Sequence, residues 1–243
     1  MRAISLTVSI MVASAPALGD DRPLRFSVSD SSTMPMVRLA QGKVTAGILH
    51  DLHQRIAEKI GRQAEQVVMS RSRIQPLLAE GTVDVSCYVN PAWIDEHRAS
   101  YRWSVPFMTQ RIQLVAAATT PPTTIEHLRD ERIGTVLGFT YPELEPSFRD
   151  ATLTRDDART ESQVLAKLAA GRYRYALSSE TALAWFNRDR PAERKLRTMD
   201  QFVEYSIHCL VRDEPDVPAN EILEAMQQLQ DDGEFEAILA KYR

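Results

Sequence analysis

Two spacings of apolar residues alternate along the first part of the chain. Residues 24–29 alternate apolar and polar side chains, as a strand does, whereas residues 49–60 carry leucine and isoleucine at helical spacing. Residues 67–70 predict a second strand, residues 74–80 a helix that ends before a glycine, and residues 82–89 a third strand. This order indicates a parallel sheet with helices on its faces.

The pattern restarts after residue 118. A strand at 112–118 is followed by the breaker Thr-Thr-Pro-Pro at 119–122, and a capping box from Thr123 to Glu126 predicts the start of a short helix. The alternation then repeats, with strands at 132–137, 151–154, 173–178 and 205–212, helices after 140, at 161–170 and from 179, and two closing helices. We therefore expect an α/β protein with two lobes.

Composition agrees with a globular protein of this kind. The chain has 243 residues, of which 44% are hydrophobic and 26% charged, enough for two lobes of roughly 100 residues each. Its 29 basic and 33 acidic side chains give a net charge of −4. Because no strongly basic surface is indicated, we expect no nucleic acid partner.

The N-terminus has the pattern of a secretory signal peptide. Met1-Arg2 gives a positive start, residues 3–15 are mostly apolar, and small residues at 15, 17 and 19 fit cleavage. A membrane anchor is the alternative, but the apolar run is shorter than the about 20 residues that cross a bilayer. No cysteine follows for lipid attachment. We expect residues 1–19 to be a signal peptide and the mature protein to be periplasmic.

The cysteines and histidines leave few options for metal chemistry. Cys87 and Cys209 lie in apolar runs, where they either form a disulfide in an oxidising compartment or remain two buried thiols. Two cysteines alone do not make a structural zinc site. His50 and His53 are three residues apart on a predicted helix, and we interpret them as surface histidines. We expect no metal and no other cofactor.

Ligands of open α/β sheets bind at the carboxyl ends of the strands. In the first lobe these ends are the loop at Asp30, which Met36 closes, and the loop at 88–98; in the second they are 138–140 and the turn at 178–180. The candidate ligand-binding residues are Asp30, Met36, Tyr88, Asn90, Arg98, Gly138, Phe139, Thr140, Ser179 and Glu180.

Two of these features suit a carboxylate ligand. Arg98 can hold a carboxylate through two hydrogen bonds, and the amides and hydroxyl at 138–140 would suit an anion at a helix start. Each has a simpler alternative, since Arg98 lies in a charged loop and Thr140 fits a plain helix cap. Met36, Tyr88 and Phe139 either flank the ligand or pack the lobes.

Several segments together resemble the family 3 extracellular solute-binding proteins, the periplasmic receptors of polar amino acid ABC transporters. They cover nearly all of the mature chain: GILHDL at 47–52, LLAEGTVDV at 77–85, YRWSVPF at 101–107, RIGTVLGFT at 132–140, LAAGRYRYAL at 168–177, YSIHCLVR at 205–212 and DDGEFEAILAKY at 231–242.

The resemblance implies a type II periplasmic-binding-protein fold, in which two lobes joined by two crossing strands close over a ligand. It places lobe I at 20–108 plus 209–243 and lobe II at 109–208. It also implies a binding protein rather than an enzyme, a monomer with a small-molecule ligand and a transporter permease as partners. Because the third strand and the returning strand pair in this fold, Cys87 and Cys209 should lie close together.

The chain differs from the family at positions that bind the ligand. Relatives place an aspartate for the α-ammonium group where this sequence has Ser179, followed by Glu180, and one acidic position of their Gly-Phe-Asp segment is Leu49 here. The ligand is therefore a small polar solute, amino acid-like or a carboxylate. The alternatives are an enzyme similar to the cyclohexadienyl dehydratases, with Glu180 or Asp30 as proton donor, and a ligand-sensing partner of a membrane receptor kinase.

Overall fold

A computed structural model describes residues 22–94 and 101–243 of the chain. The predictions of a signal peptide at 1–19 and of a ligand contact by Arg98 lie outside the described residues. Within them, no helix combines the length and the apolar character that crossing a bilayer requires.

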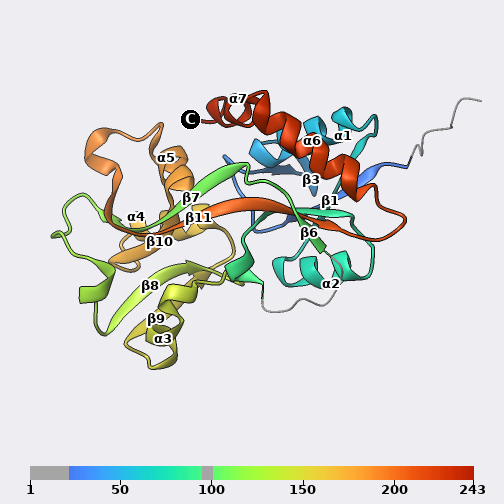
Figure 1. Cartoon of the computed structure of the whole chain (residues 1–243). Helices are drawn as coiled ribbons and strands as arrows, with labels where there is room; N and C mark the ends of the chain where they lie inside the picture. Colours follow the sequence, from blue (N-terminus) through green and yellow to red (C-terminus); the bar gives the residue numbers. More distant parts are fainter. Residues whose placement is uncertain (1–21, 95–100) are drawn as a thin grey trace, which may run out of the picture.

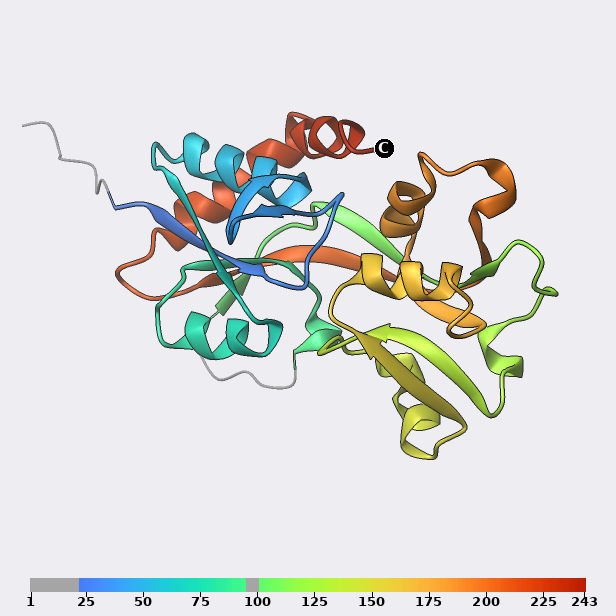
Figure 2. The same ribbon diagram turned by 180° about the vertical axis from the view of Figure 1, so that it is seen from behind.

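The first lobe is built on three parallel strands in the order β4-β1-β5 (Figure 1). Helices α1, α6 and α7 lie on one face of these strands and α2 on the other, as both views show (Figures 1 and 2). The elements are β1 (Leu24–Ser29), β2 (Arg38–Ala40), β3 (Lys43–Ala46), α1 (Ile48–Lys59), β4 (Ala64–Met69), α2 (Ile74–Ala79), β5 (Val85–Val89), β6 (Tyr101–Trp103), α6 (Ala219–Asp231) and α7 (Glu234–Ala240).

The second lobe repeats this plan with the parallel strands β10-β8-β9. Strand β7 joins β10 in antiparallel orientation, and β11 joins β7 in the same way. Its elements are β7 (Met108–Ala117), β8 (Glu131–Val136), α3 (Glu145–Arg149), β9 (Leu153–Ala158), α4 (Glu161–Ala169), β10 (Tyr175–Ser179), α5 (Glu180–Asn187) and β11 (Leu196–Arg212).

Two adjacent segments cross between the lobes. Strand β11 pairs with β7 in the second lobe up to Ile207, and from His208 onward with β5 and β6 in the first. The segment that leads into β7 runs beside it, since the amides of Ser104 and Phe107 donate to Cys209 and Ile207. Each lobe has its own hydrophobic core. The predicted α/β class, two lobes and two crossing strands are confirmed; the lobe boundaries at 20–108 plus 209–243 and 109–208 stay a prediction.

The two cysteines are cross-strand partners at this crossing. Cys87 of β5 is opposite Cys209 of β11, with their Cα atoms 3.9 Å apart and the sulfurs bonded at 2.02 Å. The disulfide closes a sequence separation of 122 residues and ties the crossing strand to the sheet of the first lobe. This contact is the one that the family resemblance implies.

Two local predictions are wrong. The segment after Thr123 forms only the short 3-10 turn Ile125–His127, and no side-chain cap bond closes it; the Thr123 hydroxyl donates instead to the carbonyl of Thr124. Strand β11 has 17 residues, far longer than the apolar run 205–212. Its first part alternates exposed and partly buried positions, so polar side chains obscure the strand in the sequence.

The interpretation of two surface histidines is also wrong for His53. Its ring is 0% exposed and stacks on Phe26 with centroids 4.2 Å apart, so it belongs to the core of the first lobe. Gln66 contacts His53 Nδ1 at 2.8 Å and His50 Nδ1 at 2.9 Å. Burial, followed by the charge of His50, lowers the pKa of His53 from 6.5 to about 3, which keeps the ring neutral.

Candidate functional site

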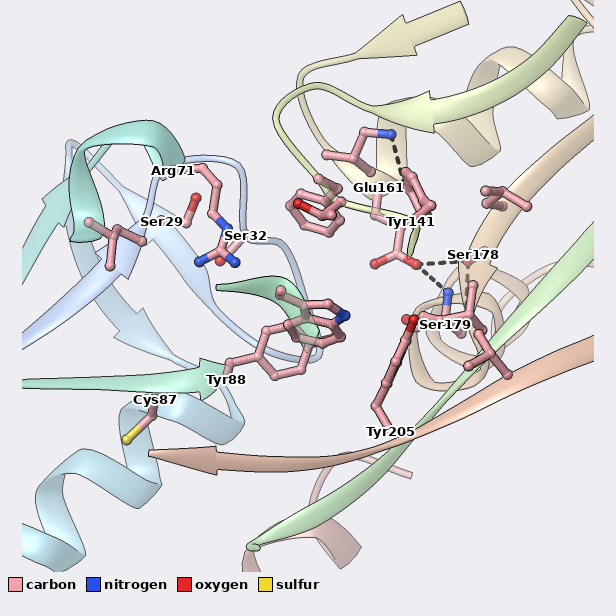
Figure 3. A pocket seen from close by; sticks show the side chains of 18 of the residues that line it. Ser29, Ser32, Arg71, Cys87, Tyr88, Tyr141, Glu161, Ser178, Ser179 and Tyr205 are labelled. Carbon is pink, nitrogen blue, oxygen red and sulfur yellow. Dashed lines mark hydrogen bonds between the residues drawn. The ribbon is translucent and has the colours of Figure 1, made fainter. Parts of the chain in front are cut away.

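A cavity of about 70 Å³ lies between the two lobes, beside the crossing strands (Figure 3). One water occupies roughly 15 Å³ on the same measure, so the space suits a small molecule. Both lobes contribute to its wall, which is formed at the carboxyl ends of β1, β5, β8 and β10. This is the position at which open α/β sheets bind ligands.

Arg71 is the cation of the first-lobe wall. It follows the carboxyl end of β4, in the short 3-10 turn Arg71–Arg73, and Figure 3 shows its guanidinium extending toward the cavity beside Ser29 and Ser32. Within residues 22–94 and 101–243 it has no hydrogen bond or ion pair, and burial lowers its pKa. A half-buried guanidinium without a partner is costly, so this side chain is suited to an anionic partner.

Glu161 is the carboxylate of the opposite wall. It begins α4, and its Oε1 accepts hydrogen bonds from the amide of Ser179 at 2.5 Å and the hydroxyl of Ser178 at 3.0 Å (Figure 3). Its Oε2 has no hydrogen-bond partner in the described part of the chain. Burial raises the pKa of Glu161, although these hydrogen bonds act in the opposite direction. No basic side chain neutralises it within those residues.

Aromatic rings connect the two walls. Trp93 packs edge-on against Tyr205 with centroids 5.0 Å apart, and Tyr88 lies 6.2 Å from Trp93. Tyr88 donates to Gln110 at 2.9 Å and Tyr205 to Glu143 at 2.5 Å. Burial raises the pKa of both phenols, so they stay protonated at neutral pH.

Tyr88 occupies a backbone conformation that side chains rarely adopt. Its φ is +66°, inside β5, where a glycine would be expected. The charges of Glu161 and Arg71 both act on its hydroxyl, the first raising and the second lowering its pKa after the larger effect of burial. Tyr88 therefore lies within electrostatic reach of both charged groups.

Four of the sequence-predicted site residues line this cavity. Tyr88 belongs to the first lobe, and Phe139, Thr140 and Ser179 belong to the second. The polar groups of Ser179 already have partners. Its hydroxyl caps α5 by accepting from Ala182 at 3.1 Å, and its amide donates to Glu161. Asp30, Met36, Asn90, Gly138 and Glu180 do not line it.

Three of the predicted residues outside the cavity wall have other surroundings. Asp30 is exposed beyond the end of β1, and Met36, only 8% exposed, packs in the core of the first lobe. Asn90 caps a turn by accepting from Ala92 and donates to the carbonyl of Ser206. These positions follow strands in the sequence, but their side chains satisfy their own loops or the core.

Glu180 and Gly138 are further corrections. Glu180 points away from the cavity and pairs at 3.0 Å with Arg111, in a groove on the other side of the crossing strands. Gly138 has φ +76°, and a methyl group there would lie 3.9 Å from the Cβ of Arg71, so it brings the second lobe close to the first. The helix expected after residue 140 begins with the 3-10 turn Pro142–Leu144, which runs into α3, so Thr140 does not cap it.

Sequence reasoning missed the two charged residues of the site. Arg71 obeys the rule applied to the other candidates, since it directly follows the strand predicted at 67–70, and applying the rule to that strand would have indicated it. Glu161 gave no such signal. An acidic residue after Thr160, whose hydroxyl accepts from Gln163, is an ordinary helix start.

The family assignment is clear from sequence. The model of the bacterial extracellular solute-binding proteins, family 3, matches residues 26–243. A search of curated proteins found no match.

Solved structures have the same fold. An ancestral arginine-binding protein bound to arginine superposes with a TM-score of 0.75 at 20% identity, covering 90% of this chain and 97% of that one. A histidine kinase sensor domain with similarity to periplasmic binding proteins gives 0.75 at 23%, covering 91% and 96%. The ancestral amino acid-binding protein AncCDT-1, a precursor of cyclohexadienyl dehydratase, gives 0.71 at 18%, covering 90% and 95%.

These likenesses confirm the type II periplasmic-binding-protein fold. The family match covers both lobes, the crossing strands and every residue of the cavity wall. The protein belongs to the bacterial extracellular solute-binding proteins, family 3.

Proposed function

We propose that this protein captures an amino acid-like zwitterion between its lobes in the periplasm and delivers it to an ABC transporter. The observation that carries the proposal is a pair of charges on opposite walls, Arg71 on the first lobe and Glu161 on the second, neither of which forms an ion pair among the described residues. A ligand with a carboxylate at Arg71 and a cation at Glu161 satisfies both. The family and its arginine-bound relative support this reading.

Glu161 supplies the negative charge that Ser179 lacks. The relatives' aspartate would stand at residue 179, and here the backbone amide of Ser179 instead holds the Glu161 carboxylate at 2.5 Å. The charge comes from the start of α4 rather than from the end of β10. The departure at Ser179 is therefore compatible with a cationic group on the ligand.

The position of Arg71 and Glu161 on different lobes favours closure of the lobes over the ligand. Arg71 and Glu161 belong to different lobes, so a molecule that bridges them binds best when the lobes are together. Because each unpaired charge is costly in a site shielded from water, the bridging ligand stabilises the closed form.

A ligand screen tests the proposal. The purified protein should show a raised Tm with one or more amino acids or betaines in a panel that also contains organic acids and polyamines. Small-angle X-ray scattering should show compaction with the same compounds. A panel in which only dicarboxylates or only polyamines act would contradict the zwitterion. Uptake of the identified ligand by cells with and without the gene tests delivery to a transporter.

One observation favours a second candidate, an enzyme resembling the cyclohexadienyl dehydratases. The raised pKa of Glu161 suits a proton donor in a cleft, whereas Glu180 and Asp30 lie outside the cavity wall. Incubation with prephenate or arogenate separates the candidates: recovery of unchanged compound contradicts the enzyme, and a dehydrated product contradicts pure binding. A sensor role, as in the kinase domain with this fold, predicts binding without transport.

A further inference from the structure

The cavity wall is rich in aromatic side chains. Both lobes and the crossing strand β11 contribute rings: Tyr88, Trp93, Phe139, Tyr141, Phe202 and Tyr205. Aromatic faces carry negative electrostatic potential, and they attract cations without donating or accepting a conventional hydrogen bond. In Figure 3 Tyr88 and Tyr205 lie below the space that separates Arg71 from Glu161.

The carboxylate acceptors on the Glu161 side are already partly engaged. Both hydrogen bonds from Ser178 and Ser179 go to Oε1, which leaves Oε2 for a ligand. The second carboxylate of the wall, Glu143, already accepts from Tyr205. A primary ammonium brings three N–H donors, and each one left without an acceptor in a desolvated site weakens binding.

The first-lobe side of the cavity instead offers hydrogen-bond donors that have no acceptor in the described part of the chain. Arg71 is unpaired, and Trp93 Nε1 is a buried donor that meets no acceptor among the described residues. Ser29 and Ser32 lie beside Arg71 (Figure 3). These donors match a carboxylate, which accepts up to four hydrogen bonds and donates none.

We propose that the ligand is a betaine-type zwitterion, with its carboxylate at Arg71 and an N-methylated ammonium among the rings beside Glu161. Methyl groups spread the positive charge over a surface that needs no acceptor and contacts aromatic faces well. The positive charge of the methylated ammonium is still balanced by the Glu161 carboxylate. This inference rests on the proposed function and narrows it to one class of compound.

A methylation series tests the inference while keeping charge and spacing fixed. Glycine, sarcosine, N,N-dimethylglycine and glycine betaine are compared by calorimetry with the purified protein at pH 7.5. The pair γ-aminobutyrate and γ-butyrobetaine repeats the comparison at a longer spacing. We expect affinity to rise with each methyl group and the betaine of the better-fitting spacing to bind at least about tenfold tighter than its primary amine.

Ring removal at Tyr205 gives an independent readout. Tyr205→Leu removes the ring, and Tyr205→Phe keeps it but loses the hydrogen bond to Glu143. The quantity compared is the ratio of the two affinities, betaine over primary amine, because it does not depend on the folded fraction. We expect Tyr205→Leu to lower that ratio at least about threefold and Tyr205→Phe to keep it. If Tyr205→Leu does not fold, Tyr88→Leu and Tyr88→Phe serve as the matched pair.

The outcomes separate the two proposals. Tightest binding by a primary amine, such as glycine or arginine, overturns the methylated ligand and leaves the zwitterion-binding function intact. An affinity ratio that Tyr205→Leu and Tyr88→Leu both leave unchanged also overturns it. A series and an amino acid panel in which nothing binds overturn both proposals.

Discussion

The two walls of the cavity are built from equivalent elements, yet they carry opposite chemistry. The first-lobe wall offers donors, with Arg71 after β4 and the indole of Trp93 after β5. The second-lobe wall offers the Glu161 carboxylate, which two donors of its own lobe already hold. Among the described residues, the donors of the first wall have no acceptor, whereas the Glu161 carboxylate of the second wall already accepts two hydrogen bonds.

This difference has an energetic consequence. Removing Arg71 removes the positive charge of its wall, because no other cationic group lines the cavity within the described residues. Neutralising Glu161 leaves the hydrogen bonds from Ser178 and Ser179 and the aromatic rings in place. The comparison therefore predicts unequal effects, which the following experiments address in order of expected size.

Arg71→Ala should have the largest effect. Losing a charged hydrogen bond to a carboxylate costs about 1.5 to 3 kcal/mol, so affinity should fall roughly 10- to 150-fold. Calorimetry with the ligand from the screen measures it. The matched control is Arg73→Ala, which removes an exposed arginine from the same turn. Equal effects of the two substitutions would remove Arg71 from the site.

Glu161→Gln should weaken binding by about tenfold, or about 1.4 kcal/mol. The amide oxygen still accepts from Ser178 and Ser179, so the wall keeps its shape and loses only its charge. Glu180→Gln is the control, because Glu180 is an acid of similar sequence environment that pairs with Arg111 outside the cavity. A larger loss for Glu180→Gln than for Glu161→Gln would reverse the assignment of the two acids.

Acidification should affect the second wall alone. Burial raises the pKa of Glu161, so lowering the pH from 7.5 to 5 protonates it earlier than an ordinary carboxyl, while Arg71 keeps its charge. Affinity should fall over this range, by less than the Glu161→Gln substitution costs at pH 7.5. The Glu161→Gln variant should show a flatter pH profile. Parallel profiles for the two proteins would show that another group titrates.

The smallest effect should be on the ligand-free protein. A carboxyl with a folded-state pKa above its ordinary 4.5 binds its proton more tightly when folded, so its contribution to stability falls as pH rises through that range. At pH 7 the neutral Glu161→Gln should therefore have a higher free energy of unfolding than the parent. The difference should vanish below pH 4.5. Urea titrations at both pH values measure it, and a less stable variant at pH 7 contradicts the raised pKa.

The order of strands and helices could be predicted because it depends on the spacing of apolar residues and glycines over short stretches of sequence. Alternation at 24–29, helical spacing at 49–60 and the glycine after residue 80 identified the corresponding strand and helices. Strand β11 was recognised only at 205–212, because its earlier residues are half exposed and carry polar side chains. His53 was misplaced for a related reason: its neutral ring packs like an aromatic residue, and only the stacked Phe26 reveals this.

The site was predicted in place but not in detail. Tyr88, Phe139, Thr140 and Ser179 line the cavity because the carboxyl ends of strands converge there. Glu180 and Ser179 are adjacent in the sequence, yet a helix begins between them and turns the Glu180 carboxylate toward Arg111. Whether a polar residue after a strand faces the cavity or its own loop depends on this local geometry, as Asn90 shows.

The sequence by itself determined the class of fold, the family and the edge of the sheets where the cavity lies, because each follows from residue spacing and segment order. Tertiary structure alone decided which charges face each other. Arg71 and Glu161 are 90 residues apart in the sequence and belong to different lobes. Only the packing of two separate sheets across the crossing strands brings a guanidinium and a carboxylate to one small cavity.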